Sequence, residues 1–329
     1  MKAVVINDFG GPEQLIVTEL PIPEPKENEI LLENKIIGVG KPEFLIRSGN
    51  DPYLRDKLPG LVIGNESLGI VKAVGSQVKN FKVGDHAALL SGTGCGSHAE
   101  YSCGEERFAI PLPKEVPFEN MAGVLNLQVA YALIHDAGKG TDGQSMYMKG
   151  AAGGIGTIMV QVAKAAGMKV IVSASTEEKC AVLRELGADH VFNYKEASEK
   201  DEIMKATDGL GVDLVFDQLA GPDFAAQFEY LADFGMIVLY NWMKVDPCLD
   251  QIGTIIKEAP HAHAVRSFSY HVFDRKTERR MGNASKVLSL VAEGKVKSYI
   301  GASFPLEEAR KAHELLDAGT TIGKIIMVP

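Results

Sequence analysis

A glycine-rich turn at residues 150–156 constrains the fold of this chain more than any other stretch. Its sequence, Gly-Ala-Ala-Gly-Gly-Ile-Gly, follows a short apolar run at residues 145–149 that has the length of a buried strand. Apolar residues then recur at three- and four-residue spacing, which predicts a helix. They are Ile155, Ile158, Met159, Val162, Ala163 and Ala166. Strand, glycine turn and helix in this order are typical of a site that holds a dinucleotide pyrophosphate.

The glycines of this turn have separate expected roles. Gly153 lets the backbone approach the phosphate, and Gly156 lets the helix pack closely on the strand. The N–H groups and the dipole at the helix start attract the anion. Ala151 stands where the first glycine of the G-x-G-x-x-G pattern is usual, so the match is incomplete. The residues expected to contact the dinucleotide are Ala152, Gly153, Gly154, Ile155 and Gly156.

Length and charge limit the partners of this chain. Its 329 residues suffice for two domains. A formal net charge of -9 disfavours nucleic acid and anionic membranes, which need basic patches. The four cysteines are scattered and form no C-x-x-C pair, and there is neither a signal peptide nor a long apolar stretch. We therefore expect a cytoplasmic protein that acts on a small molecule.

The rhythm of the chain predicts two domains of different type. Residues 1–125 contain many short strand-like runs between Gly and Pro turns, which favours a distorted β barrel. Residues 126–270 alternate strands and helices, which predicts a doubly wound parallel sheet with its ligand at the carboxyl ends of the strands. We assign the tail, residues 271–329, to the first domain. The predicted fold class is α/β.

The order of these parts resembles the medium-chain dehydrogenase/reductase superfamily, and within it the zinc-free quinone oxidoreductase (zeta-crystallin-like) family. The motifs that carry the resemblance are Gly10-Gly11-Pro12-Glu13, Ile46-Arg47-Ser48-Gly49, Val83-Gly84-Asp85, the glycine turn with Gln161, and Gly323-Lys324. The similarity runs from end to end. It implies a GroES-like catalytic domain beside a Rossmann domain, and a homodimer formed near Ala264 to Tyr270.

The resemblance also bears on metal binding. Zinc-dependent members have cysteine where this chain has Gly40 and histidine where it has Asn65. Glycine has no ligand atom, and an amide is a poor zinc ligand beside thiolate or imidazole. We predict that the protein binds no metal.

The choice of nicotinamide cofactor depends on the end of the second strand of the parallel sheet. NAD sites usually place a carboxylate there, about 20 residues beyond the glycines, but this chain has Ser175. The phosphate-binding lysine and tyrosine of quinone oxidoreductases map onto Lys179 and Tyr194, which favours NADPH; alternatively, Lys179 is a solvated helix charge. The resemblance also places Leu239 and Asn241 near the nicotinamide.

Without a metal, the cofactor supplies hydride and the protein supplies position and polarity. The acceptor is then a quinone or the C=C bond of an α,β-unsaturated carbonyl compound, whose oxygen needs hydrogen-bond donors. The candidate catalytic residues are Tyr53, Asn65 and Gln128. Tyr53 is also able to donate a proton, or it is a loop aromatic packed on the barrel.

Two alternatives stay open. The first is an enoyl-thioester reductase, which acts on acyl-CoA or acyl-carrier substrates. Tyr53 stands before Gly64-Asn65-Glu66 at the same distance as the catalytic tyrosine of that branch, which this segment resembles. The second alternative is a protein that binds NADPH without turnover, because the resemblance to crystallin-like members implies that such a role is possible. The pocket also departs from typical quinone oxidoreductases, which have asparagine at Gly40, aspartate at Glu43 and commonly threonine at Gln128.

Overall fold

The computed structural model describes residues 1–50, 58–90, 96–240 and 261–329. The chain forms two compact units, which are described separately. Unit 1 comprises residues 1–127 and 277–329, and unit 2 comprises residues 128–276. The boundaries expected from the sequence, at residues 126 and 271, lie a few residues before these divisions.

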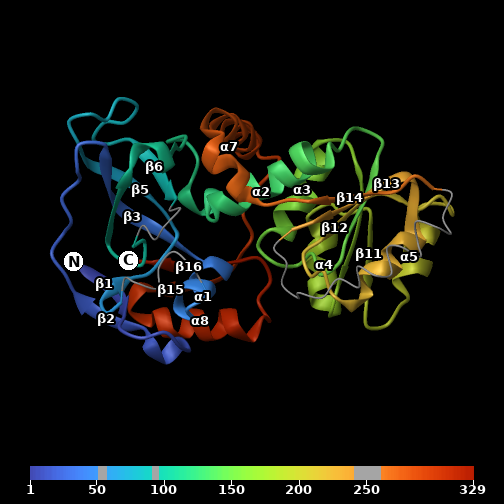
Figure 1. The fold of residues 1–329 in the computed structure, drawn as a ribbon, viewed down its shortest axis with the longest axis horizontal. Coiled ribbons are helices and arrows are strands. Elements are labelled where there is room, and N and C mark those ends of the chain that lie inside the picture. The colour runs from blue at the N-terminus through green and yellow to red at the C-terminus, as the bar shows by residue number, and fades with distance from the viewer. Residues whose placement is uncertain (51–57, 91–95, 241–260) are drawn as a thin grey trace. The chain divides into compact units, whose positions relative to one another are not determined.

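Unit 1 is built on two sheets (Figure 1). The larger has the strand order β15-β16-β3-β5-β6-β8, with β7 also paired to β3, and the smaller has the order β2-β1-β4. The strands are β1 (Lys2–Ile6), β2 (Ile16–Glu19), β3 (Glu29–Val39), β4 (Leu61–Val62), β5 (Glu66–Val74), β6 (His86–Leu90), β7 (Tyr101–Glu105), β8 (Ala109–Pro111), β15 (Ile300–Pro305) and β16 (Lys324–Val328). The helices are α1 (Lys41–Arg47), α7 (Thr277–Ala292) and α8 (Ala309–Ala318), with short 3₁₀ turns η1 (Pro12–Gln14), η3 (Glu106–Phe108), η4 (Phe118–Met121) and η8 (Leu306–Glu308).

The central strand of unit 1 is β3, which pairs with β5, β7 and β16. Near its start, Ile30 and Leu32 point into one apolar cluster with Val71 and Leu89, as the two-residue period of a strand requires. Its end and α8 contribute to a second cluster. Because β16 pairs antiparallel with β3, the C-terminal tail completes the sheet that the N-terminal residues begin.

Unit 2 contains a six-stranded sheet in the order β11-β10-β9-β12-β13-β14, and its strand pairs are all parallel. The strands are β9 (Ser145–Met148), β10 (Lys169–Ala174), β11 (His190–Asn193), β12 (Val212–Asp217), β13 (Leu231–Leu239) and β14 (Ala264–Ser267). The helices are α3 (Gly156–Ala165), α4 (Glu177–Glu185), α5 (Glu199–Ala206), the π-helical η5 (Leu133–Gly138), and the 3₁₀ segments η6 (Pro222–Tyr230) and η7 (Tyr270–Arg275). Helix α2 (Val124–Ala132) crosses the division between the units.

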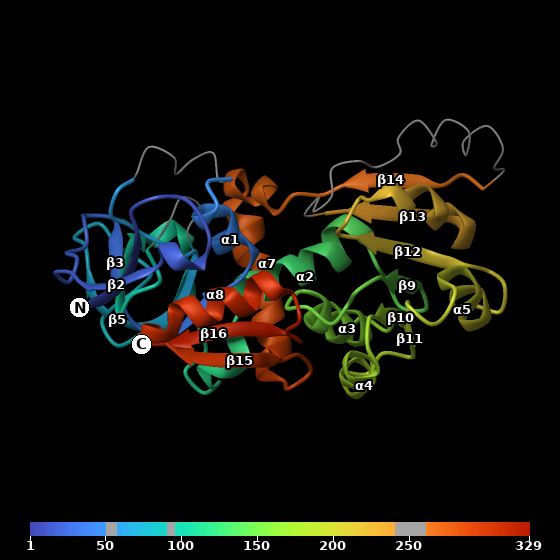
Figure 2. The same ribbon diagram turned by 90° about the horizontal axis from the view of Figure 1, so that it is seen from below.

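The strand order reverses beside β9, which is the first strand in sequence and lies between β10 and β12. In Figure 2, α3 and α4 lie on one side of this sheet and α5 lies on the other. Helices on both faces of a parallel sheet define the doubly wound arrangement, so the predicted α/β fold class is confirmed. In such a sheet the ligand binds beyond the carboxyl ends of the strands, next to the reversal.

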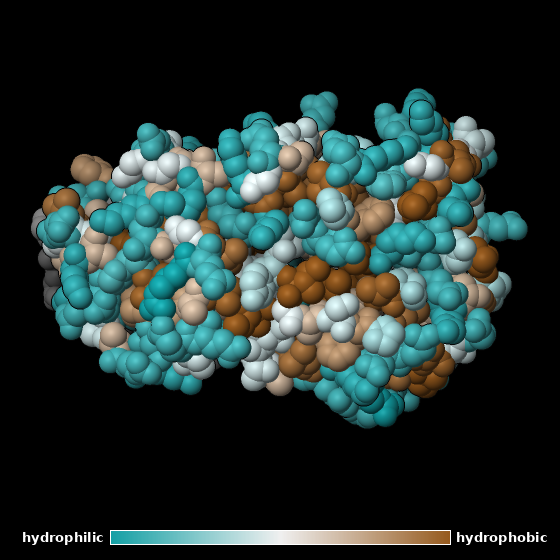
Figure 3. Space-filling view, turned by 180° about the vertical axis from the view of Figure 1, so that it is seen from behind, coloured by the Kyte–Doolittle hydropathy of each residue, from teal (hydrophilic) through white to brown (hydrophobic). Residues whose placement is uncertain are grey.

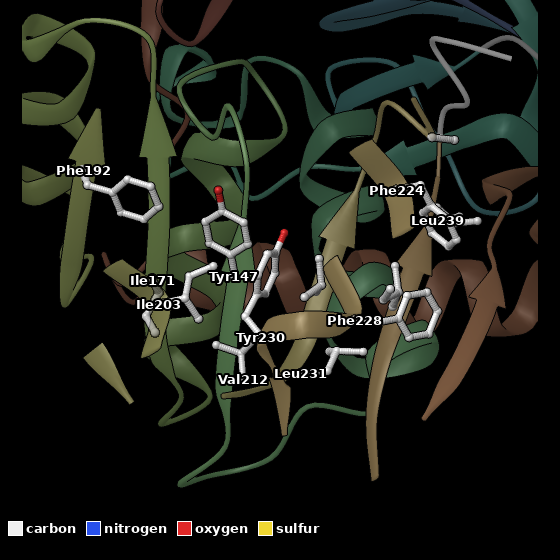
Figure 4. Close-up of a cluster of buried hydrophobic side chains, with 13 residues drawn as sticks. Tyr147, Ile171, Phe192, Ile203, Val212, Phe224, Phe228, Tyr230, Leu231 and Leu239 are labelled. Atoms are coloured by element: carbon white, nitrogen blue, oxygen red, sulfur yellow. The ribbon is translucent and has the colours of Figure 1, made fainter. Parts of the chain in front are cut away.

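An aromatic cluster supports the sheet beneath this edge (Figure 4). Tyr147 of β9 is stacked on Phe192 of β11 and meets the ring of Tyr230 edge-on, with centroid distances of 5.9 and 5.7 Å. Ile171 and Ile203 close the cluster from β10 and α5. These contacts hold β9, β10 and β11 in register.

None of the helices in the described ranges combines the length and the apolar character needed to cross a membrane. On the face shown in Figure 3, hydrophilic and hydrophobic residues are interspersed.

Candidate functional site

The glycine turn follows the carboxyl end of β9 and leads directly into α3. The Ala151 N–H donates to the Ser173 carbonyl at 3.0 Å, and the Thr157 hydroxyl donates to the Gly153 carbonyl at 3.1 Å. No side chain from the described residues caps the start of α3. The turn is thus anchored at both ends. The Thr157 and Ile158 N–H groups donate to the Gly153 and Ile155 carbonyls, and the positive end of the α3 dipole favours an anion at the helix start.

Two glycines of the turn differ in their surroundings. A Cβ on Gly156 would lie 2.2 Å from the Ala151 carbonyl oxygen, so only glycine fits there. A Cβ on Gly153 would meet no atom of the described residues within 4 Å, and Gly153 is exposed. The open space above Gly153 fits the close approach of a pyrophosphate. Ala152 is buried, and Gly154 and Ile155 are partly exposed.

The structure brings Ser175 and Tyr194 together. Ala174 and Asn193 are paired in the parallel register of β10 and β11, and the Tyr194 N–H donates to the Ala174 carbonyl at 3.0 Å. Ser175 and Tyr194 each follow one of these strand ends. Thr176 caps α4 by accepting the Lys179 N–H at 3.3 Å, which fixes Lys179 in the first turn of that helix.

Lys149 is a further cation at this edge that sequence reasoning did not identify. It follows Met148, the last residue of β9, and its Nζ atom lies 5.4 Å from the Tyr194 ring centroid. Lys149 also forms an ion pair with Glu199. Its position directly after a central strand could have indicated a residue near the ligand, because the carboxyl ends of parallel strands meet at one edge of the sheet. Nothing in the sequence indicated Glu199.

Beneath these residues lies a buried hydroxyl network. The Tyr147 hydroxyl is 2.8 Å from Ser173 Oγ and donates to Glu199 Oε2 at 3.1 Å. Burial is the main reason why the pKa of Tyr147 is raised well above its ordinary value, and the Glu199 charge adds to it. Tyr147 is therefore a neutral structural donor that positions Glu199 beside Lys149.

Of the two residues expected near the nicotinamide, the structure describes Leu239, the last residue of β13. Leu239 is buried in the apolar cluster, and its carbonyl accepts the Phe268 N–H at 2.8 Å. Asn241 lies outside the described residues.

The candidate catalytic residues fall into different parts of the chain. Gln128 belongs to unit 2, is fully buried, and its Oε1 accepts the Tyr270 hydroxyl proton at 2.6 Å. Asn65 belongs to unit 1, where its N–H donates to Glu43 Oε1 at 2.9 Å. Tyr53 lies outside the described residues.

The Glu43 carboxylate accepts hydrogen bonds from the backbone at positions 40 and 65. Glu43 Oε2 accepts the Gly40 N–H at 2.8 Å, and Oε1 accepts the Asn65 N–H. Glu66 Oε2 accepts the Leu125 N–H at 2.6 Å, and Glu66 Oε1 lies 3.4 Å from Lys324 Nζ. Sequence reasoning named Glu43 only as a departure from the family pattern and did not foresee this cluster.

Among the residues that the structure describes, this cluster contains one cation, Lys324, for two buried carboxylates. Glu43 and Glu66 are each 2% exposed, and Lys324 is 8% exposed. Burial raises the pKa of Glu43 to about 7, Lys324 opposes that rise, and the Glu66 charge adds to it. Within the described ranges, no three His, Cys, Asp or Glu side chains are grouped as a metal site.

Comparison with known proteins agrees with this architecture. Residues 26–114 match the family described as "Alcohol dehydrogenase GroES-like domain", and residues 154–271 match the family described as "Zinc-binding dehydrogenase". The quinone oxidoreductase of Rattus norvegicus is 30% identical over 332 residues, which cover 100% of this chain and 98% of that protein. The chain belongs to the quinone oxidoreductase family. The family lies within the medium-chain dehydrogenase/reductase superfamily, so the resemblance inferred from the motifs is confirmed.

Two further relatives are informative for chemistry. A 2-haloacrylate reductase from Burkholderia sp is 29% identical, over 100% of this chain and 99% of that protein. The Escherichia coli quinone oxidoreductase, whose crystal structure is a complex with NADPH, has a TM-score of 0.87 and 28% identity, with 100% of both chains covered.

Proposed function

We propose that this member of the quinone oxidoreductase family is a zinc-independent, NADPH-dependent reductase that transfers hydride to quinones or to the C=C bond of α,β-unsaturated carbonyl compounds. The full-length similarity to the rat quinone oxidoreductase carries the proposal. The glycine turn supports it, because Gly153 leaves space above the start of α3. When bound there, NADPH supplies the hydride.

The preference for NADPH rests on the residues at the ends of β10 and β11. Ser175 replaces the carboxylate that would repel a 2′-phosphate, and Tyr194 lies beside it. Lys179 in the first turn of α4 would supply a charge-assisted hydrogen bond. We propose that Ser175, Lys179 and Tyr194 bind the 2′-phosphate, with the pyrophosphate on residues 152–156 and the nicotinamide near Leu239 and Asn241.

Replacing Lys179 tests the cofactor assignment. Lys179→Ala removes a hydrogen bond to a charged group, which contributes about 1.5–3 kcal/mol, so the NADPH dissociation constant should rise about 10- to 100-fold. The NADH dissociation constant should stay nearly unchanged. Lys169→Ala, at the opposite end of β10, is the matched control. Equal losses for NADPH and NADH in the Lys179 variant would show that Lys179 does not bind the phosphate.

The acceptor needs donors for the oxygen on which negative charge collects. Asn65 and Gln128 are amides suited to this role, and the Tyr270 hydroxyl holds the Gln128 side chain by donating to its Oε1. Tyr53 completes the proposed set. The Burkholderia relative is named as a reductase of 2-haloacrylate, an activated alkene, which favours C=C reduction as one activity.

The decisive experiment is NADPH oxidation, with NADH in parallel, against 1,4-benzoquinone, 9,10-phenanthrenequinone, 2-alkenals, 2-chloroacrylate and crotonyl-CoA. Turnover of free quinones or alkenes supports the proposal. Activity confined to crotonyl-CoA would replace it by an enoyl-thioester reductase, with Tyr53→Phe as the next variant. Tight NADPH binding without turnover of any acceptor would indicate the non-catalytic alternative.

We also propose that the protein is a homodimer joined through β14. This strand is at the edge of the six-stranded sheet, and Val265 within it is 42% exposed. An exposed edge strand presents unpaired backbone groups to a second copy. Size-exclusion chromatography with light scattering would refute the proposal by giving the mass of one chain.

The cytoplasm stays the expected compartment. Cys103 and Cys180 are free thiols, as a reducing environment permits. Fractionation of cells that express the tagged protein tests this expectation, and recovery from an oxidising compartment would contradict it.

A further inference from the structure

The buried cluster of Glu43, Glu66 and Lys324 has an excess of negative charge. Lys324 Nζ lies 3.4 Å from Glu66 Oε1, and Glu66 Oε1 has no hydrogen-bond partner among the described residues. One ammonium group neutralises one carboxylate. A second buried carboxylate without a cation costs several kcal/mol, unless it binds a proton.

Glu43 is the carboxyl group placed to bind that proton. Its two oxygens accept the N–H groups of Gly40 and Asn65, while the ion pair of Lys324 is made with Glu66. Burial is the dominant influence on Glu43 and raises its pKa to about 7, so the neutral acid is well populated near neutral pH. The groups that face it are Lys324 of β16 and Glu66 of β5.

The cluster lies directly beneath a position that has no side chain. A Cβ on Gly40 would be in van der Waals contact with Lys324 Nζ at 3.5 Å and Glu43 Oε2 at 3.7 Å, so one further atom fits beside both groups among the described residues. Gly40 is partly exposed. Typical quinone oxidoreductases have asparagine at this position, and its side chain would fill this space. In this chain residue 40 is glycine, so no side chain at that position covers Glu43.

We propose that Glu43, held by Lys324 and Glu66, is the proton donor of the reduction and passes its proton beside Gly40 to the oxygen of the reduced substrate. The inference rests on the proposed function. Hydride brings two electrons and one hydrogen to the quinone, which becomes a hydroquinone anion while the nicotinamide is oxidised. The Glu43 O–H bond breaks, the hydroquinone O–H bond forms, and the Glu43 carboxylate regains a proton from solvent.

Infrared spectroscopy tests whether Glu43 holds a proton, independently of activity. The carbonyl stretch of a buried carboxylic acid should be present near pH 6 and lost by about pH 8, because the Glu43 pKa is about 7. Glu43→Gln should lack this band. Glu33→Gln, a partly exposed carboxylate of β3 paired with Lys35 and Lys72, should keep it. A wild-type spectrum without a titrating band in this range would overturn the proposal.

Steady-state kinetics tests whether the proton is used. Wild-type kcat should fall as pH rises through about 7. Glu43→Gln should lower kcat at least about 100-fold, the usual contribution of a general acid, and abolish that pH dependence, whereas Glu33→Gln should keep both. If Glu43→Gln retains the wild-type pH profile at any level of activity, the proton comes from another group.

A second variant guards against local misfolding of Glu43→Gln. Lys324 lowers the pKa of Glu43, so Lys324→Met should move the midpoint of the infrared titration to higher pH. An unchanged midpoint would contradict the proposed cluster. Failure of the wild-type protein to oxidise NADPH with any acceptor would instead refute the proposed function, and the infrared titration would still decide whether Glu43 stores a proton.

Discussion

Acidification is expected to destabilise unit 1 through a buried pair of histidines. His98 Nε2 and His313 Nε2 are 3.1 Å apart, and both side chains are fully buried. Their Nδ1 atoms have no hydrogen-bond partner among the described residues. Burial lowers the pKa of both, that of His313 to about 3, and the Arg47 charge contributes for His313. For His98, the charges of His313 and Lys324 act in the same direction.

The size of the effect follows from proton linkage. The folded state excludes a proton that the unfolded chain binds below about pH 6.5, so stability is complete above that pH and falls as the pH falls below it. With a pKa of about 3 in the folded state, His313 contributes about 2 kcal/mol to the loss at pH 5. His98 adds to the loss in the same direction.

The free energy of unfolding in urea, followed by circular dichroism at about pH 7.5 and about pH 5, measures this loss. His313→Gln removes one titrating group, so its loss between the two pH values should be smaller than that of wild type by about 2 kcal/mol. His271→Gln is the control, because His271 is 77% exposed beside Asp274. Equal losses in wild type and His313→Gln would refute the reasoning.

Three further predictions concern other parts of the molecule. Gly156→Ala should destabilise by about 1–3 kcal/mol through overpacking, seen as a lower Tm, whereas Gly153→Ala should keep the Tm and weaken NADPH binding; the same response in both would contradict their separate roles. Asp317→Asn should cost about 3 kcal/mol in urea, because it leaves the Arg47 guanidinium buried and unpaired, while Glu229→Gln in an exposed pair should cost under about 1 kcal/mol. Val265→Lys on β14 should give a single-chain mass in light scattering, and an unchanged dimer would place the interface elsewhere.

Local patterns were sufficient to predict most of the architecture. The glycine turn lies between β9 and α3 as expected, and the short apolar run at residues 145–149 contains the strand β9. These predictions succeed because a strand-turn-helix unit depends on residues that are close in sequence. The period of the apolar residues, the glycines of the turn and the residue that caps the helix are all local features. The sequence analysis assigned the tail to the first domain, and in the structure β16 of the tail pairs antiparallel with β3.

The family resemblance identified Gly40 and Asn65 as the positions where zinc-dependent members have their ligands, so the absence of zinc stays a prediction from the sequence. Tertiary structure decided which charges meet. Parallel register set Lys149 beside Tyr194, and packing of β16 on β3 brought Lys324 to Glu66. His98 and His313 are 215 residues apart and touch because α8 packs against the N-terminal strands within unit 1. Such contacts depend on how distant elements bury their apolar faces, and no local pattern in the sequence records that choice.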